Sequence, residues 1–164
     1  MVSTSLNLET ISLNEVKAFV RVDTDAHDAL LTVLMNAAMH ECFNLTHTCF
    51  GTGEITVKRW DVLQQLDLPY GPVNSITSVK LDGETTDSAN YELRGNLLQI
   101  DVAYSESIEV VYAIGTTMPA DVKHAILQRI KYGFDFGDDL PQNQQPRFFD
   151  RVLMRYRDHK TFAG

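Results

Sequence analysis

Apolar residues recur at helical spacing over residues 12–46. Residues 12–15 (Ser-Leu-Asn-Glu) have the form of a capping box, in which the Ser12 hydroxyl accepts from the Glu15 amide and the Glu15 side chain reaches back. Leu13, Val16 and Val20 then fall on one helical face, with Phe19 beside them. The pattern predicts a short, capped first helix.

A second helix is predicted after the interruption at residues 22–25 (Val-Asp-Thr-Asp), where Thr24 or Asp25 is a suitable N-cap. Five apolar residues follow at intervals of three or four and form one stripe: Leu31, Leu34, Ala38, Cys42 and Leu45.

Residues 52–114 change to the two-residue alternation of β-strands. Strands are predicted at 54–60, 76–81 and 107–113, and a hairpin at 91–93 and 97–100. Residues 69–72 (Pro-Tyr-Gly-Pro) and 82–83 (Asp-Gly) are turn signals. Because no strand is followed by a crossover helix, the pattern indicates a small antiparallel sheet rather than a nucleotide-binding βαβ fold.

Helical spacing returns after Pro119, a residue suited to the first turn of a helix. The helix continues to about residue 136, and the polar, proline-containing residues 137–146 are typical of a linker. A short basic helix with its own apolar stripe follows. The fold class is therefore α+β: an N-terminal helix pair, a small antiparallel β-sheet with hairpins, a C-terminal helix, a linker and a terminal basic helix. We expect a core domain at 1–136, a polar linker at 137–146 and a C-terminal docking helix at 147–164.

Charge is distributed unevenly. The 164 residues carry a net charge of -8, but residues 147–164 hold five Lys/Arg and two Asp/Glu, a net charge of +3. The other residues hold nine Lys/Arg and twenty Asp/Glu. This balance argues against a protein that grips nucleic acid by its phosphates, and such asymmetry often marks a docking segment.

Composition further restricts the kinds of protein that this chain can be. A hydrophobic content of 44% is normal for a globular domain with a core. We find neither a run of about 20 apolar residues nor a secretion signal, so we expect no membrane partner and a protein that is made and kept in a cytoplasm. Cys42 and Cys49 do not make a disulfide framework.

One cluster could carry metal chemistry: His40, Cys42, His47 and Cys49 include zinc-type donors within ten residues. On a helix, residues two apart diverge by about 200°, and Cys42 already belongs to the apolar stripe. A buried structural thiol with surface histidines is the preferred interpretation, and a small metal-dependent enzyme is the alternative. We find no nucleophile elbow and no phosphate-binding glycine loop, so we predict no enzyme and no cofactor.

The terminal helix has two interpretations. It is either a last helix packed on its own domain or a helix that reaches a neighbouring molecule through aromatic and Arg side chains, the types that dominate interface energetics. The second predicts that deleting residues 147–164 leaves a folded protein without partner binding. The candidate partner-binding residues are Arg147, Phe148, Phe149, Arg151, Val152, Arg155, Tyr156 and Arg157.

The order of these motifs resembles the head-tail connector family of tailed phages, which includes portal adaptors and head completion proteins. The resemblance covers residues 11–136. It rests on a capped helix leading to Val-Arg-Val-Asp, a long second helix ending in Leu-Thr, the strand and turn series, and a closing strand and helix. These motifs lie at residues 11–17, 20–23, 25–38, 45–46, 60, 69–73, 76–83, 110–115 and 118–126. His47 replaces a common glycine, and the segment after Asp135 matches no pattern of the family.

The resemblance implies a structural virion protein at the head-tail interface, or neck. Its subunits would form a homo-oligomeric ring, commonly a dodecamer, beneath the portal protein and above a stopper or tail protein. DNA would pass through the ring during ejection without specific binding, and an acidic lining would repel phosphate. Alternatives are a head-tail stopper or tail completion protein, the metal-dependent enzyme above, and a ligand-binding β module.

Overall fold

The computed structural model describes residues 1–62, 64–101, 104–137 and 147–157. The chain divides into two compact units. The sheet unit contains Met1–Leu8 and His47–Thr117, and the helical unit contains Glu9–Thr46 and Met118–Arg157. The residues expected to form one core domain thus contribute to both units. Residues 138–146 of the expected linker lie outside the described residues. No helix in the described ranges has the length and apolar character needed to cross a membrane.

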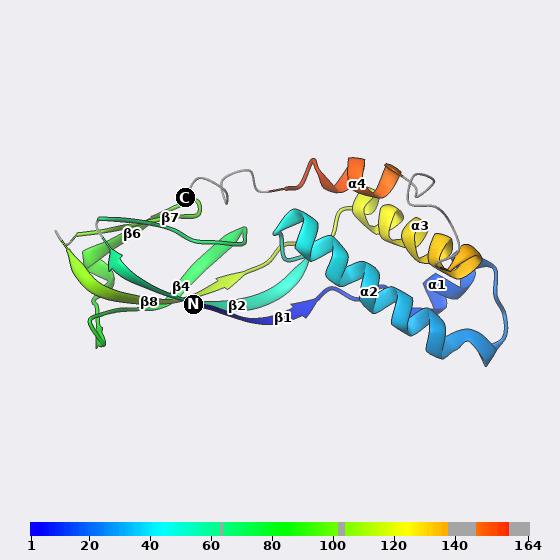
Figure 1. Cartoon of the computed structure of the whole chain (residues 1–164), viewed down its shortest axis with the longest axis horizontal. Helices are drawn as coiled ribbons and strands as arrows, with labels where there is room; N and C mark the ends of the chain where they lie inside the picture. Colours follow the sequence, from blue (N-terminus) through cyan, green and yellow to red (C-terminus); the bar gives the residue numbers. More distant parts are fainter. Residues whose placement is uncertain (63, 102–103, 138–146, 158–164) are drawn as a thin grey trace. The chain divides into compact units, whose positions relative to one another are not determined.

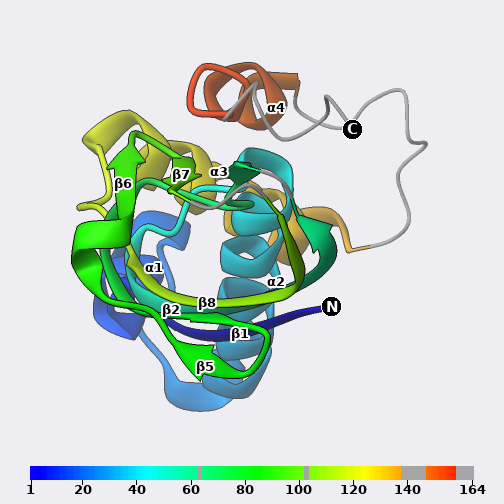
Figure 2. The same cartoon turned by 90° about the vertical axis from the view of Figure 1, so that its left-hand side faces the viewer.

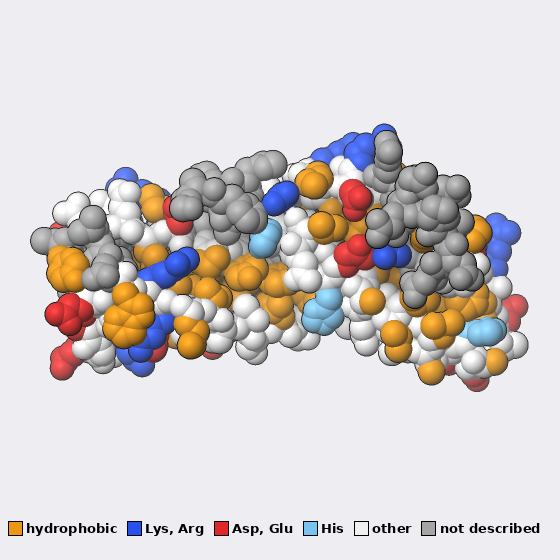
Figure 3. All heavy atoms as spheres, viewed as in Figure 1, with side chains coloured by type: hydrophobic (Ala, Val, Ile, Leu, Met, Phe, Trp, Pro, Cys, Tyr) orange, Lys and Arg blue, Asp and Glu red, His pale blue; other side chains and the backbone are white. Residues whose placement is uncertain are grey.

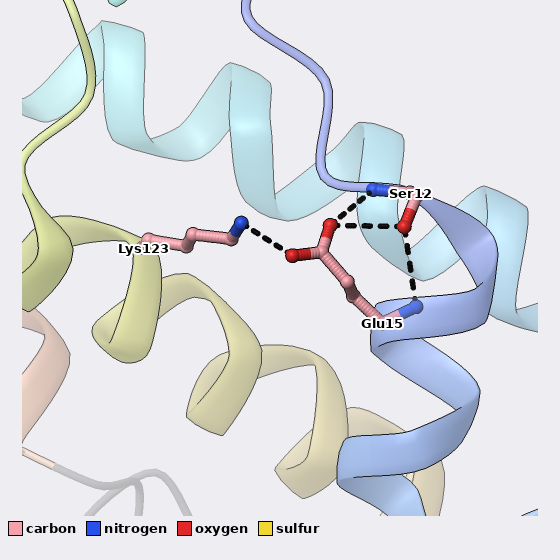
Figure 4. A network of polar contacts seen from close by, with 3 residues as sticks. All are labelled: Ser12, Glu15 and Lys123. Atoms are coloured by element: carbon pink, nitrogen blue, oxygen red, sulfur yellow. Dashed lines mark hydrogen bonds and ion pairs between the residues drawn. The ribbon is translucent and has the colours of Figure 1, made fainter.

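The first helix, α1 (Leu13–Val20), begins as predicted. Ser12 Oγ accepts a hydrogen bond from the Glu15 amide (3.3 Å), and Glu15 Oε2 accepts one from the Ser12 amide (3.0 Å). The other carboxylate oxygen, Oε1, binds Lys123 Nζ at 2.6 Å, so the box also ties α1 to α3 (Ala120–Phe136) (Figure 4). These contacts lower the pKa of Glu15 to about 2, the hydrogen bond from Lys123 being the largest cause.

The second helix, α2 (Asp28–Thr46), follows a short 3₁₀ turn, η1 (Asp25–His27). Of the two predicted caps, Thr24 is the N-cap residue of η1 and has extended backbone, but its side chain makes no capping hydrogen bond. The Asp25 carboxylate instead binds Lys17 Nζ at 2.6 Å.

The predicted α2 stripe lies against the core of the helical unit. Leu31, Ala38 and Cys42 are buried, and Leu34 and Leu45 are half-buried. Figure 1 shows α2 and α3 side by side, with α4 (Arg147–Leu153) next to α3. The buried side of α3 consists of Val122, Ala125, Ile126 and Ile130, which are four of the residues expected at helical spacing.

The main sheet of the sheet unit has five antiparallel strands in the order β1-β2-β8-β4-β5. The central β8 (Ser105–Ile114) confirms the predicted alternation, since Ile108, Val110 and Tyr112 are fully buried. The other strands are β1 (Val2–Leu8), β2 (Gly51–Val62), β4 (Val73–Leu81) and β5 (Glu84–Thr85).

A second sheet of three strands has the order β3-β7-β6. It contains the predicted hairpin, β6 (Tyr91–Arg94) and β7 (Leu97–Ile100), together with β3 (Gln65–Asp67). A 3₁₀ turn, η2 (Ser88–Asn90), precedes β6. Figure 2 shows the large sheet curving, with β6 and β7 over its concave side. Leu66, Leu98 and Ile100 are buried, as expected where two sheets share a core.

Two turns show how local chemistry sets the chain path. Asp82 and Gly83 have φ values of 51° and 87°, the two positive values that a tight hairpin requires between β4 and β5. His47, where the resemblance expects glycine, has φ 54° and so adopts a conformation that glycine favours.

The strand β1 was not predicted. Its sequence alternates through Val2, Leu6 and Leu8 on one side and polar residues on the other, which is a strand pattern. Its partner is β2, from Val2 opposite Val57 to Leu8 opposite Gly51. Pairing with a segment more than forty residues away is what completes this edge of the sheet.

Candidate docking surface on the C-terminal helix

The terminal helix α4 is anchored to the helical unit by its apolar side. Phe149, Val152 and Leu153 are 2%, 3% and 1% exposed, respectively. Their spacing of three and four residues puts them on one face of the helix. These three side chains, of which Phe149 and Val152 are candidate partner-binding residues, therefore stabilise the fold of their own unit.

The residues just after α4 are held by a polar contact. The Tyr156 hydroxyl lies 2.8 and 3.0 Å from the two carboxylate oxygens of Asp121, in the first turn of α3. This hydrogen bond is the main reason why the pKa of Tyr156 is raised. Tyr156 thus fixes the end of the described chain to the beginning of α3.

Phe148 connects the buried and exposed sides of α4. Its ring packs edge-on against His124, with centroids 5.9 Å apart, and the Arg151 guanidinium lies 6.0 Å from its centroid. His124 also contacts Phe19 of α1, at 5.7 Å between centroids. These contacts hold Phe148 half-buried, with Arg151 over its ring.

The outward side of α4 and its C-terminal turn is basic with an apolar centre. Asp150, Arg151, Met154 and Arg155 are exposed, and Met154 retains 46% of its accessible surface. Phe148, Asp150, Arg151 and Met154 line a shallow hollow. Figure 3 shows Lys and Arg side chains (blue) gathered over α4. We call Phe148, Arg151, Met154 and Arg155 the α4 surface; its chemistry suits an acidic partner with an apolar protrusion.

The eight residues expected to bind a partner therefore divide into groups. Arg151 and Arg155 are exposed, and Phe148 and Arg157 are half-buried. Phe149, Val152 and Tyr156 make the contacts within the unit described above. Arg147 is the first residue of α4, and its side chain lies outside the described part of the structure.

Sequence reasoning overlooked Met154, which is spaced three residues from Arg151 on the outward side. A methionine beside arginines on a short helix was the available signal.

The packing of Phe149 and its neighbours also changes the expected outcome of deleting residues 147–164. The deletion would uncover apolar side chains of the helical unit, so substitutions on the outward side are the cleaner test.

Acidic residues outnumber basic residues in the segment of the sheet unit. Residues 47–117 hold ten Asp/Glu and four Lys/Arg. Many of these acids are exposed in its loops and short strands, among them Asp82, Glu84, Asp87, Glu92 and Asp101. The basic terminal segment belongs to the helical unit, whose residues 9–46 and 118–146 hold ten Asp/Glu and five Lys/Arg, so both units have an excess of acids outside that segment.

The His/Cys cluster does not form a metal site in the described residues, where no three His, Cys, Asp or Glu side chains are grouped to hold an ion. Cys42 is buried in the helical unit and Cys49 in the sheet unit, while His40 is exposed. Burial raises the pKa of the Cys42 thiol to about 12, and it also raises the pKa of Cys49. Both side chains are neutral core thiols at ordinary pH.

Comparison with known proteins identifies one family. The model of a family described as "Head completion protein" matches residues 9–136. No curated protein matches the chain.

Solved structures match over the whole chain. A chain from the neck of an empty gene transfer agent particle computed with C6 symmetry has a TM-score of 0.79 at 17% identity. A chain from the virion of a native gene transfer agent particle gives 0.78 at 15%, and one from the neck of a native particle computed with C12 symmetry gives 0.74 at 16%. Each match covers 100% of this chain and 98% of the other. At these identities the likeness establishes a shared fold.

Proposed function

The chain belongs to the head completion protein family, and from this premise we propose that it is a structural head-tail connector (adaptor) subunit of a tailed phage or phage-like particle. Copies of the chain form a ring in the neck of the virion, beneath the portal protein and above a stopper or tail protein. DNA passes through the ring. The family match over residues 9–136 is the observation that carries this proposal.

The shared fold supports the ring. Two of the matching structures are particle necks computed with C6 and C12 symmetry, and each of these matches covers the whole of this chain. A cyclic ring requires each subunit to present two different faces to its neighbours. In this proposal the function of the protein is to assemble into a ring, which requires no catalytic group.

Charge supports the two roles of the subunit. The segment of the sheet unit, with ten acids against four bases, would repel the phosphates of passing DNA. The α4 surface offers Arg151 and Arg155 around Met154 and Phe148, which would recognise an acidic, partly apolar site on the portal protein.

Binding to portal-containing heads tests the proposal. Heads purified without neck proteins are mixed with the full chain and examined by electron microscopy, and an added ring at the portal vertex is expected. Absence of that ring would contradict the adaptor role. Binding only to heads that already carry another neck protein would instead indicate a stopper or tail completion protein.

A charge reversal tests the α4 surface separately. The double variant Arg151→Glu/Arg155→Glu should bind heads at least about tenfold more weakly, because each removed contact between opposite charges contributes on the order of 1 kcal/mol. The control is Arg59→Glu/Arg94→Glu, which makes the same change in net charge at exposed positions of the sheet unit. Equal binding by both variants would exclude the α4 surface as the docking site.

A further inference from the structure

Helix α2 has a second stripe of residues on its outward side, separate from the stripe that faces the core. Leu30, Val33, Ala37 and His40 recur at alternating intervals of three and four residues, and all four are exposed. Leu30 and Val33 retain 48% and 63% of their accessible surface. This alternation is the heptad spacing with which one helix packs along another. We call these four residues the α2 seam.

The α2 seam lies on an uncharged part of the helix. Between Asp28 and Glu41 the sequence has no Asp, Glu, Lys or Arg over twelve residues. A solvated helix face normally carries charged residues, and the centres of protein interfaces are depleted of them. Figure 3 shows hydrophobic side chains (orange) along the outward face of α2.

We propose that the α2 seam packs against a second copy of this chain, the adjacent subunit of the ring; this inference rests on the proposed function. The net charge of the chain is the argument for this occupant. At -8, copies repel one another on average, and an uncharged, apolar contact between neighbouring subunits adds no further charge repulsion. The basic α4 surface, in contrast, is suited to a different, acidic partner.

The size of the α2 seam indicates when this contact forms. From Leu30 to His40 the helix rises about 15 Å, and with a width of about 10 Å the seam covers on the order of 150 Å². A stable interface buries about 800 Å² on each partner. The seam alone therefore does not hold free copies together, and it is occupied when a template brings subunits side by side at high effective concentration.

Photo-cross-linking identifies the molecule that packs against the α2 seam. A photoreactive amino acid replaces Val33 in the full chain, the chain is incorporated into particles, and the particles are irradiated. The expected product is a covalent pair of two copies of this chain, and free protein at micromolar concentration should give at least tenfold less of it. The matched control replaces Ala18, which is exposed on α1, outside the seam.

The outcomes separate this inference from the proposed function. A cross-link from position 33 to a different protein, or a yield of paired chains no higher than from position 18, would overturn the inference while leaving a ring subunit. A chain absent from the particles would refute the proposed function and the inference with it. As a second measurement, Val33→Glu should fold normally by circular dichroism, because position 33 is exposed, and give at least tenfold fewer complete rings than Ala18→Glu. Equal ring formation by the two variants would also overturn the inference.

Discussion

Replacing Phe149 by alanine tests whether α4 is an integral part of the helical unit. The side chain is 2% exposed, so the substitution removes a nearly complete burial and leaves a cavity beside α3. Substitutions of this kind cost about 3–5 kcal/mol. Since whole domains are stable by about 5–15 kcal/mol, we expect Phe149→Ala to remove a large fraction of the stability of this unit.

Urea unfolding followed by circular dichroism at 222 nm measures the effect, because this signal reports the helices. The matched control is Met154→Ala, which removes an exposed side chain from the turn following the same helix. The control should change the free energy of unfolding by no more than about 0.5 kcal/mol. A loss below about 1 kcal/mol for Phe149→Ala, or equal losses for both variants, would refute the packing of α4 on its own unit.

Three further predictions concern the backbone, the capping box and the thiols. Gly115→Ala should lower the stability of the sheet unit by more than about 3 kcal/mol in urea unfolding followed by the fluorescence of Trp60 in β2, because its Cβ would lie 2.2 Å from a backbone oxygen of Gly51, at φ 145°. Near wild-type stability would contradict this close approach. Glu15→Gln should be less stable than wild type at pH 7, and the difference should shrink in acid titrations as the pH falls from 4.5 towards 2. The reason is that the folded state lowers the pKa of this carboxyl from 4.5 to about 2, so its contribution is lost only as it becomes protonated; a constant difference over that range would count against the network. Cys42 and Cys49 should react with a thiol reagent at pH 8 only after urea is added, since both are buried with raised pKa values; two thiols titrated in native protein would contradict the burial.

Sequence reasoning was most successful where neighbouring residues decide the structure. The capping box at Ser12 and Glu15 and the turn at Asp82 and Gly83 form as predicted, because each depends on contacts within four residues. The alternation along β8 likewise identified the buried side of that strand. The family resemblance over residues 11–136 agrees with the family match over residues 9–136.

Local patterns could not decide the partners of these elements. The alternation of β1 is visible in the sequence, but an edge strand is completed only by pairing, here with β2 more than forty residues later. The salt bridge from Glu15 to Lys123 is equally non-local. Such contacts depend on how the chain returns to itself, which periodicity does not encode.

The C-terminal helix shows most clearly what each level contributes. The sequence by itself predicted a basic, aromatic helix in residues 147–164, because composition and spacing are properties of the chain, and in the described residues this helix covers Arg147–Leu153. Only the tertiary structure decided which side chains are used internally. Phe149 and Val152 are buried and Tyr156 binds Asp121, whereas Arg151 and Arg155 are exposed. The physical reason is that an amphipathic helix has one apolar side, and the protein's own core and a partner compete for it.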